Sequence, residues 1–179
     1  MLILPYKNLE PRIGRGVFIA ENATVIGDVW LGDDSSVWYG TVLRGDVFPI
    51  RIGARTNIQD NCVLHVTQST WPTILEEEVT IGHGVIAHGC TVRRGCLIGM
   101  GSRLLDGSEI GEDSLVGAGA LVTEGMKVPP RSLVLGVPAK VRRELTPDEV
   151  NHIHRNFQHY LDYKETYLKQ QRRSASEAQ

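Results

Sequence analysis

Aliphatic residues recur at every sixth position along most of this chain. The period begins at residue 13, is broken by two insertions and one five-residue step, and defines roughly 20 hexads. The aliphatic positions are Ile13, Ile19, Val25, Leu31, Val37, Leu43, Ile52, Ile58, Leu64, Leu75, Ile81, Ala87, Val92, Ile98, Leu104, Ile110, Val116, Val122, Val128 and Val134. This period matches neither an α-helix, at about 3.6 residues, nor a plain strand, at about 2. It predicts an all-β fold, a parallel β-helix in which three hexads make one triangular coil.

Glycine or another small, turn-forming residue follows most of these aliphatic positions. The chain has 19 glycines in 179 residues and only 6% aromatic residues, which suits a thin core that turns at regular intervals. The alternative is a β-sandwich, whose strands would recur less regularly, about every 8–12 residues. The strict period of six favours the β-helix.

The repeat occupies one part of the chain and gives way to a helical pattern. We expect an N-terminal segment at 1–12, the β-helix at 13–140, a C-terminal α-helix at 146–171 and a disordered polar tail at 172–179. Thr146, Pro147 and Glu149 form a capping box with proline in the first helical turn. The apolar stripe of this helix predicts packing on the outside of the β-helix or on a neighbouring subunit.

Composition limits the partners and the cellular location that we expect for this protein. The formal net charge is -2, which argues against a general nucleic-acid binder. No apolar run reaches the roughly 20 residues that a membrane-spanning helix needs, and no secretory signal is evident. The chain has three cysteines and no CxxC pair, which argues against a disulfide framework. Because free thiols are typical of a reducing compartment, we expect a cytoplasmic protein.

The repeat allows the histidines to be placed on faces. His65 and His88 are each the second residue of a hexad and lie three hexads apart. They should therefore lie one above the other on one face, at the strand spacing of about 4.8 Å. Arg44 has the same hexad position one coil earlier and joins this column. Two imidazoles at this spacing can bind one ion.

His83 falls on the preceding face, because it is the third residue of its hexad. Asp60 holds the same position one coil below, and Gln59 precedes it. A closed cyclic assembly of identical chains can bring this face against the His65 column of a neighbour. Surface histidines without a ligand are the alternative, but the polar residues at coil-equivalent positions favour a metal site.

Three neutral imidazoles leave coordination positions open, as is typical of catalytic metal sites. Zinc in such a site lowers the pKa of its bound water to about 7, so that hydroxide forms at neutral pH. Imidazole also suits iron and cobalt, so we expect zinc with iron or cobalt as alternatives.

Five segments carry a resemblance to a known family. They are RGD at 44–46, IGARTNIQD at 52–60, LHV at 64–66, IGH at 81–83 and AHGC at 87–90. Together they resemble the γ-class carbonic anhydrases, and more closely their shorter bacterial and archaeal relatives, the YrdA-like or ferripyochelin-binding proteins. The resemblance covers nearly the whole chain. It implies a left-handed β-helix and a homotrimer with metal sites between subunits, His65 and His88 coming from one chain and His83 from the next.

The resemblance also implies roles for the polar neighbours. Gln59 matches the residue that orients the metal-bound hydroxide, and Arg44 and Asp60 match an intersubunit ion pair. Asp46 and Asn57 match further members of that polar network. The implied reaction is attack of the metal-bound hydroxide on carbon dioxide to give bicarbonate, reversibly, with Arg44 supporting the bicarbonate region.

Several positions depart from the archetype of that family. Val47 stands where the archetype has a glutamate, and the insertion at 67–72 contains no acid to shuttle protons. Glu76–Glu78 come soon after the insertion, but the course of the strand there can direct their side chains away from the metal site. Tyr160 best matches a helix tyrosine that approaches the site in the shorter relatives, with packing as its alternative role. Slow turnover is therefore expected.

Two other functions remain open. The segment 136–140, GVPAK, resembles the terminal turn of hexapeptide acyltransferases, which use a single histidine as base. The three histidines favour hydration over acyl transfer. A non-catalytic metal-binding trimer is the other alternative, kept open by Val47 and the short insertion.

Overall fold

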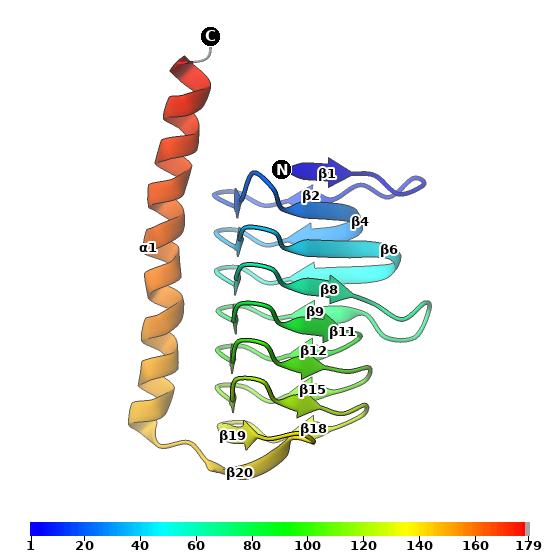
Figure 1. Cartoon of the computed structure of the whole chain (residues 1–179), viewed down its shortest axis with the longest axis vertical. Coiled ribbons are helices and arrows are strands. Elements are labelled where there is room, and N and C mark those ends of the chain that lie inside the picture. Colours follow the sequence, from blue (N-terminus) through cyan, green and yellow to red (C-terminus); the bar gives the residue numbers. More distant parts are fainter. Residues whose placement is uncertain (178–179) are drawn as a thin grey trace.

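The computed structural model describes residues 1–177, and their side chains up to Arg173. The chain winds into a stack of coils whose strands form three parallel ladders, one on each face (Figure 1). This confirms the predicted parallel β-helix with a C-terminal helix. None of the described residues forms a helix that is both long and apolar enough to cross a bilayer.

Two long strands bend from face 1 to face 2, so these faces belong to one sheet. Face 1 contains β1 (Leu2–Leu4), β4 (Thr24–Leu31), β6 (Val42–Ile52), β8 (Val63–His65), β11 (Ile86–His88), β14 (Arg103–Leu104) and β17 (Leu121–Val122). Face 2 contains β2 (Arg12–Ile13), the second halves of β4 and β6, β9 (Thr73–Leu75), β12 (Thr91–Val92), β15 (Glu109–Ile110) and β18 (Lys127–Val128).

Face 3 is a separate sheet that ends in an antiparallel strand. Its strands are β3 (Phe18–Ile19), β5 (Ser36–Val37), β7 (Asn57–Ile58), β10 (Thr80–Ile81), β13 (Leu97–Ile98), β16 (Leu115–Val116), β19 (Ser132–Leu135) and β20 (Lys140–Glu144). β20 pairs antiparallel with β19 and closes the stack. The GVPAK segment is the turn between these two strands, so it marks the end of the β-helix.

The hexad positions read from the sequence lie in the core, together with other buried residues such as Phe18, Cys62 and Val85. Every hexad position from Ile19 to Val134 is buried, and on face 1 the register stacks Leu43 on Leu64 and Ala87 on Leu104. Burying one such aliphatic side chain is worth about 1.5–3 kcal/mol. Ile13 is the exception at 40% exposed, because β2 is the outermost strand of its face.

The N-terminal segment contributes to the first coil. β1 pairs in parallel with β4, and Ile3 lies opposite Val25. Residues 2–4 thus form the end strand of face 1, and they are exposed because no further strand within residues 1–177 covers them.

Helix α1 (Pro147–Glu177) runs back along the outside of the stack, from the last coil toward the first (Figure 1). The predicted capping box is present. The backbone N–H of Thr146 donates to Oε2 of Glu149 at 2.9 Å, and the backbone N–H of Glu149 donates to Oγ1 of Thr146 at 3.3 Å. The helix continues to Glu177, so the expectation of a disordered tail from 172 is wrong up to that residue. Residues 178–179 lie outside the described part of the chain.

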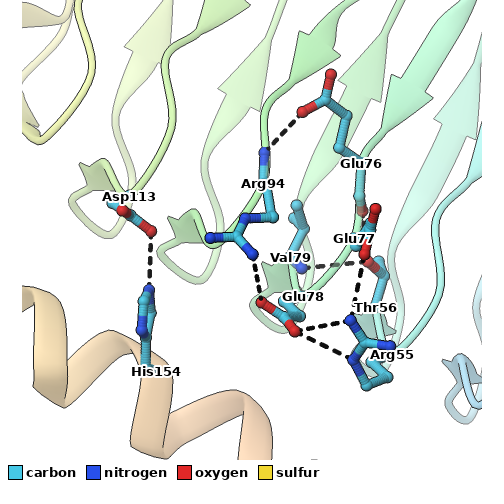
Figure 2. Close-up of polar contacts among 9 residues, drawn as sticks. All are labelled: Arg55, Thr56, Glu76, Glu77, Glu78, Val79, Arg94, Asp113 and His154. Atoms are coloured by element: carbon cyan, nitrogen blue, oxygen red, sulfur yellow. Dashed lines mark hydrogen bonds and ion pairs between the residues drawn. The ribbon is translucent and has the colours of Figure 1, made fainter.

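The helix packs on its own chain. Tyr160 and Tyr167 contact Trp38 edge-on, with ring centroids 5.5 and 5.2 Å apart. At the lower end of the helix, His154 Nε2 lies 2.8 Å from Oδ1 of Asp113 in a turn of the β-helix (Figure 2). Toward the other end, Lys164, whose side chain is buried, donates to Asp34 at 3.0 Å.

Candidate functional site

His65 and His88 are adjacent at the ends of β8 and β11. They are direct partners in the parallel register, as the hexad count predicts. Nδ1 of His65 lies 3.1 Å from Nε2 of His88. The remaining nitrogen of each ring contacts a carboxylate: His65 Nε2 lies 3.1 Å from Oδ1 of Asp46, and His88 Nδ1 lies 2.6 Å from Oδ1 of Asp106.

The carboxylates determine which ring nitrogens carry protons. An ionised carboxylate only accepts hydrogen bonds, so His65 donates from Nε2 and His88 donates from Nδ1. The two facing nitrogens then present lone pairs to each other. A tetrahedral zinc ion with bonds of about 2.1 Å holds its ligand nitrogens roughly 3.4 Å apart, close to the spacing found here. The pair therefore fits a divalent cation, and the carboxylates support it as outer partners of metal-binding histidines commonly do.

Asp46 and Arg44 extend the polar network around His65. Arg44 Nη1 lies 2.5 Å from Oδ2 of Asp46. Burial raises the pKa of Asp46, but hydrogen bonds from Arg44 and His65 outweigh it and the pKa is lowered. Burial lowers the pKa of His65, against the opposing hydrogen bond to Asp46, and the nearby Arg44 charge adds to the decrease. Asp46 is thus held as the anion, and His65 favours the neutral form that binds metals.

Asp106 was not anticipated from the sequence. It is the third residue of its hexad, one coil after His88, and so lies in the column of Gly89, next to that of His88. A count that included the neighbouring column could have identified it. Burial raises its pKa, but hydrogen bonds from Thr67 and His88 outweigh this effect and the pKa is lowered. Asp106 is therefore a fixed anion beside His88.

His83 lies on face 3, just after β10, as expected. Its Nδ1 is 2.8 Å from Oδ2 of Asp60, which leaves Nε2 available as a ligand. Gln59, only 6% exposed, donates to Oδ1 of Asn57 at 3.3 Å, and Asn57 donates to Oγ1 of Thr80 at 2.8 Å. These residues form a second polar cluster, separate from that around His65.

The structure thus divides the predicted site residues between two faces. Within residues 1–177 of one chain, no three histidine, cysteine or carboxylate side chains gather closely enough to hold a metal ion. In the single chain, Arg44 pairs with Asp46, and Asp60 pairs with His83. The Arg44–Asp60 pair expected between subunits stays a prediction.

Tyr160 lies next to the His83 cluster. With five neighbours it lines a hollow of about 350 Å³, whose walls are Trp38, Tyr39, Asp60, Tyr160, Tyr163 and Tyr167. Burial raises the pKa of Tyr160, and the charge of Asp60 adds to this increase. Tyr160 therefore both packs on Trp38 and approaches the carboxylate that holds His83.

The acids that follow the insertion are engaged by arginines. Arg93 binds Glu76. The backbone N–H of Arg94 also binds Glu76, and Arg55 binds Glu77 and Glu78 (Figure 2). Val47, in the place of the archetypal glutamate, is 38% exposed. Glu76, Glu77 and Glu78 are thus held in ion pairs with arginines.

Comparisons with known proteins agree with the fold. The family model for bacterial transferase hexapeptides (six repeats) matches residues 10–45 and 89–124. A Geobacillus kaustophilus protein named carbonic anhydrase is 48% identical, over 98% of this chain and 97% of that protein. Gamma carbonic anhydrase 2, mitochondrial, of Arabidopsis thaliana is 38% identical over 92% of this chain and 61% of its own length.

A solved structure shows the same fold. It is a hexapeptide transferase family protein from Anaplasma phagocytophilum, 40% identical, with a TM-score of 0.89 over 93% of this chain and 98% of that one. The 48% identity to the Geobacillus protein, over nearly the full length of both chains, is decisive. The chain belongs to the γ-class carbonic anhydrase-like family of hexapeptide-repeat proteins.

Proposed function

We propose that this chain is a metal-dependent lyase of the carbonic anhydrase type, which interconverts carbon dioxide and bicarbonate as a homotrimer. The observation that carries the proposal is the state of the three histidines. His65, His83 and His88 each have one ring nitrogen on a carboxylate. The second nitrogens of His65 and His88 face each other at 3.1 Å, where one ion could bind both. His154 also contacts a carboxylate, that of Asp113, but among these pairs only His65 and His88 direct their second nitrogens at each other.

The division of the site between faces supports a shared centre. His65 and His88 lie on face 1 and His83 on face 3, so a full set of ligands requires two chains. A cyclic trimer of side-by-side coils joins face 1 of one subunit to face 3 of the next and closes after three such contacts. We propose one site at each contact.

The residues around the site have distinct tasks in this proposal. His65, His83 and His88 would hold the ion, zinc or else iron or cobalt, which would supply hydroxide at neutral pH by acidifying a water molecule. Gln59, fixed by Asn57, orients the reacting oxygen through its amide. Arg44 is 44% exposed beside Asp46, and its guanidinium stabilises the bicarbonate anion.

Proton release is expected to limit the rate. The carboxylates of Glu76–Glu78 are paired with arginines, and the insertion at 67–72 contains no acid. The Tyr160 hydroxyl group, beside Asp60, is the candidate for passing the proton on, and its raised pKa makes it a poor acid. We therefore expect slow turnover.

Three buried thiols agree with a cytoplasmic location in this proposal. Cys62, Cys90 and Cys96 are unpaired, and burial raises the pKa of each to about 12. Such thiols stay protonated and act as small core residues. Free cysteines of this kind suit a reducing compartment.

Stopped-flow measurement of carbon dioxide hydration tests the proposal. The protein is loaded separately with zinc, iron(II) and cobalt(II), and wild type is compared with His83→Ala and with His152→Ala, an exposed helix histidine. Activity that requires both the metal and His83, and that survives in His152→Ala, is the expected result. Activity without metal contradicts it, as does full metal binding without hydration, which would indicate a non-catalytic metal-binding trimer.

Acyl transfer is the second candidate, because a relative of the same fold is named as a transferase family protein. Acetyl-coenzyme A binding, measured by calorimetry on the metal-free protein, separates the two functions. Tight binding that is insensitive to His65→Ala would favour acyl transfer. No binding together with metal-dependent hydration would remove it.

A further inference from the structure

The insertion between His65 and Leu75 is a closed loop built onto the next coil. The backbone N–H of Thr67 donates to the carbonyl of Trp71 at 3.0 Å, and the N–H of Trp71 donates back to Thr67 at 3.2 Å. The Trp71 ring lies over Gly107, where an added Cβ would meet ring atoms at 3.0 Å. The loop is thus held against coils beyond the one that contains His65.

This anchoring positions the hydroxyl of Thr67 on the carboxylate next to His88. Oγ1 of Thr67 donates to Oδ2 of Asp106 at 2.5 Å, and Oδ1 of Asp106 accepts from Nδ1 of His88 at 2.6 Å. Both carboxylate oxygens are therefore engaged, one on each side. The carboxylate cannot rotate without losing a charge-assisted hydrogen bond.

The local backbone also fits this arrangement. Gly89, next to His88, has a φ of +56°, and a Cβ there would collide with Oδ1 of Asp106 and with Cβ of Trp71. Asp106 can approach His88 closely because residue 89 has no side chain. Thr67 and Gly89 thus both act on the position of Asp106, the residue that contacts Nδ1 of His88.

We propose that Thr67 and Asp106 are positioning residues that hold His88 as its Nδ1–H tautomer with Nε2 directed at His65, and that the insertion at 67–72 serves to place Thr67. The inference deepens the proposed function, on which it rests for the role of Nε2 as a metal ligand. It gives the acid-free insertion a task other than proton shuttling. The Thr67 hydroxyl donates to the Asp106 carboxylate, and this carboxylate accepts from the His88 imidazole.

The test reads the tautomer of His88 in metal-free protein. Protein labelled with ¹⁵N at histidine is examined by two-bond ¹H–¹⁵N spectra, which distinguish Nδ1–H from Nε2–H. The variants are Asp106→Ala, Thr67→Val, which keeps the shape but loses the hydroxyl, and Thr67→Ser, which restores it. Asp113→Ala is the matched control, since Asp113 also contacts a histidine, His154, and its side chain is 24% exposed like that of Asp106.

The expected results are specific to the two contacts, Thr67 with Asp106 and Asp106 with His88. Wild type, Thr67→Ser and Asp113→Ala should show His88 with the proton on Nδ1, Asp106→Ala should lose this state, and Thr67→Val should show a mixture. Zinc affinity, measured by competition with a chelator, should fall by about 10- to 100-fold in Asp106→Ala and less in Thr67→Val. It should be unchanged in Asp113→Ala.

Two results would overturn the inference. One is an Nδ1–H signal for His88 that persists in Asp106→Ala; the other is an equal effect of Thr67→Val and Thr67→Ser on tautomer and affinity. The spectra of the metal-free protein do not depend on hydration activity. A His88 tautomer that follows Asp106 and Thr67 supports the inference even if carbon dioxide hydration is absent, and that absence would count against the proposed function alone.

Discussion

Nδ1 of His65 and Nε2 of His88 face each other at 3.1 Å although 23 positions separate the two residues in the chain. The hexad period explains this contact. The two residues have the same position in hexads that lie one coil apart, and the insertion between them leaves that register intact. Proximity of the two rings is therefore a property of the fold, and their use as ligands depends on the carboxylates beside them.

Removing one ligand should remove the metal. His65→Ala is expected to lose most bound zinc. Only His88 and the His83 of the neighbouring chain remain as ligands, and a site with two imidazoles holds the ion far less tightly than a site with three. Metal per subunit is measured by plasma mass spectrometry after gel filtration, with His152→Ala as the control variant. Full retention of metal in His65→Ala would eliminate the model of three histidines.

Arg44→Ala should weaken both the site and the trimer. The variant removes the guanidinium that helps to lower the pKa of Asp46, so this pKa should rise, and it removes one side of the expected ion pair with Asp60 of the neighbouring subunit. Light scattering across a dilution series measures trimer dissociation. A trimer as stable as wild type at low protein concentration would argue against the intersubunit pair.

The stacked core predicts a sharp contrast between two isoleucines. Ile98→Ala, at a fully buried position of face 3, should lower the free energy of unfolding by about 2–5 kcal/mol. Ile13→Ala, at a position 40% exposed on the end strand, should cost well under half of that. Urea unfolding of both variants at one protein concentration measures the difference. Equal losses would contradict the assignment of the hexad positions.

The capping box predicts an unusual titration at the start of α1. Hydrogen bonds from Arg143 and from the backbone of Thr146 lower the pKa of Glu149 from 4.5 to about 2. Because the folded-state value is depressed, the stabilisation by this carboxylate is fully present above pH 4.5 and is lost as the pH falls through about 2. Carbon-13 titration of the Glu149 carboxyl group checks this, and Arg143→Ala should move the midpoint upward. A wild-type midpoint near 4.5 would show that the capping box is absent.

The period of six was sufficient to predict the fold and the columns of the site. It depends on one buried aliphatic side chain per hexad, and each of these from Ile19 onward is in the core. The face assignments of His65, His88 and His83 follow from counting residues within hexads, because a regular coil converts sequence position directly into position on a face. The capping box at Thr146 was predictable for a similar reason, since its contacts are local.

The rest depended on contacts that the period does not encode. Thr67 reaches Asp106 through a closed loop whose conformation depends on Trp71 packing over Gly107, and an insertion has no hexad position from which to infer that. The polar sequence after residue 171 suggested disorder, yet α1 continues to Glu177, with Gln171 donating to the carbonyl of Ile19 at 3.2 Å. In both places tertiary contacts outweigh the local sequence signal.

A complementation experiment tests the shared site most directly. Subunits carrying His83→Ala are mixed with subunits carrying His65→Ala, unfolded and reassembled, and bound zinc and hydration rate are measured. If face 1 of one chain meets face 3 of the next, random pairing should restore about a quarter of the wild-type sites, because one ordered pair of subunits in four brings all three histidines together. Mixing His65→Ala with His88→Ala should restore none, since both changes affect the same half of the site. Recovery in the first mixture alone is the predicted result, and no recovery in either mixture would contradict a metal centre shared between subunits.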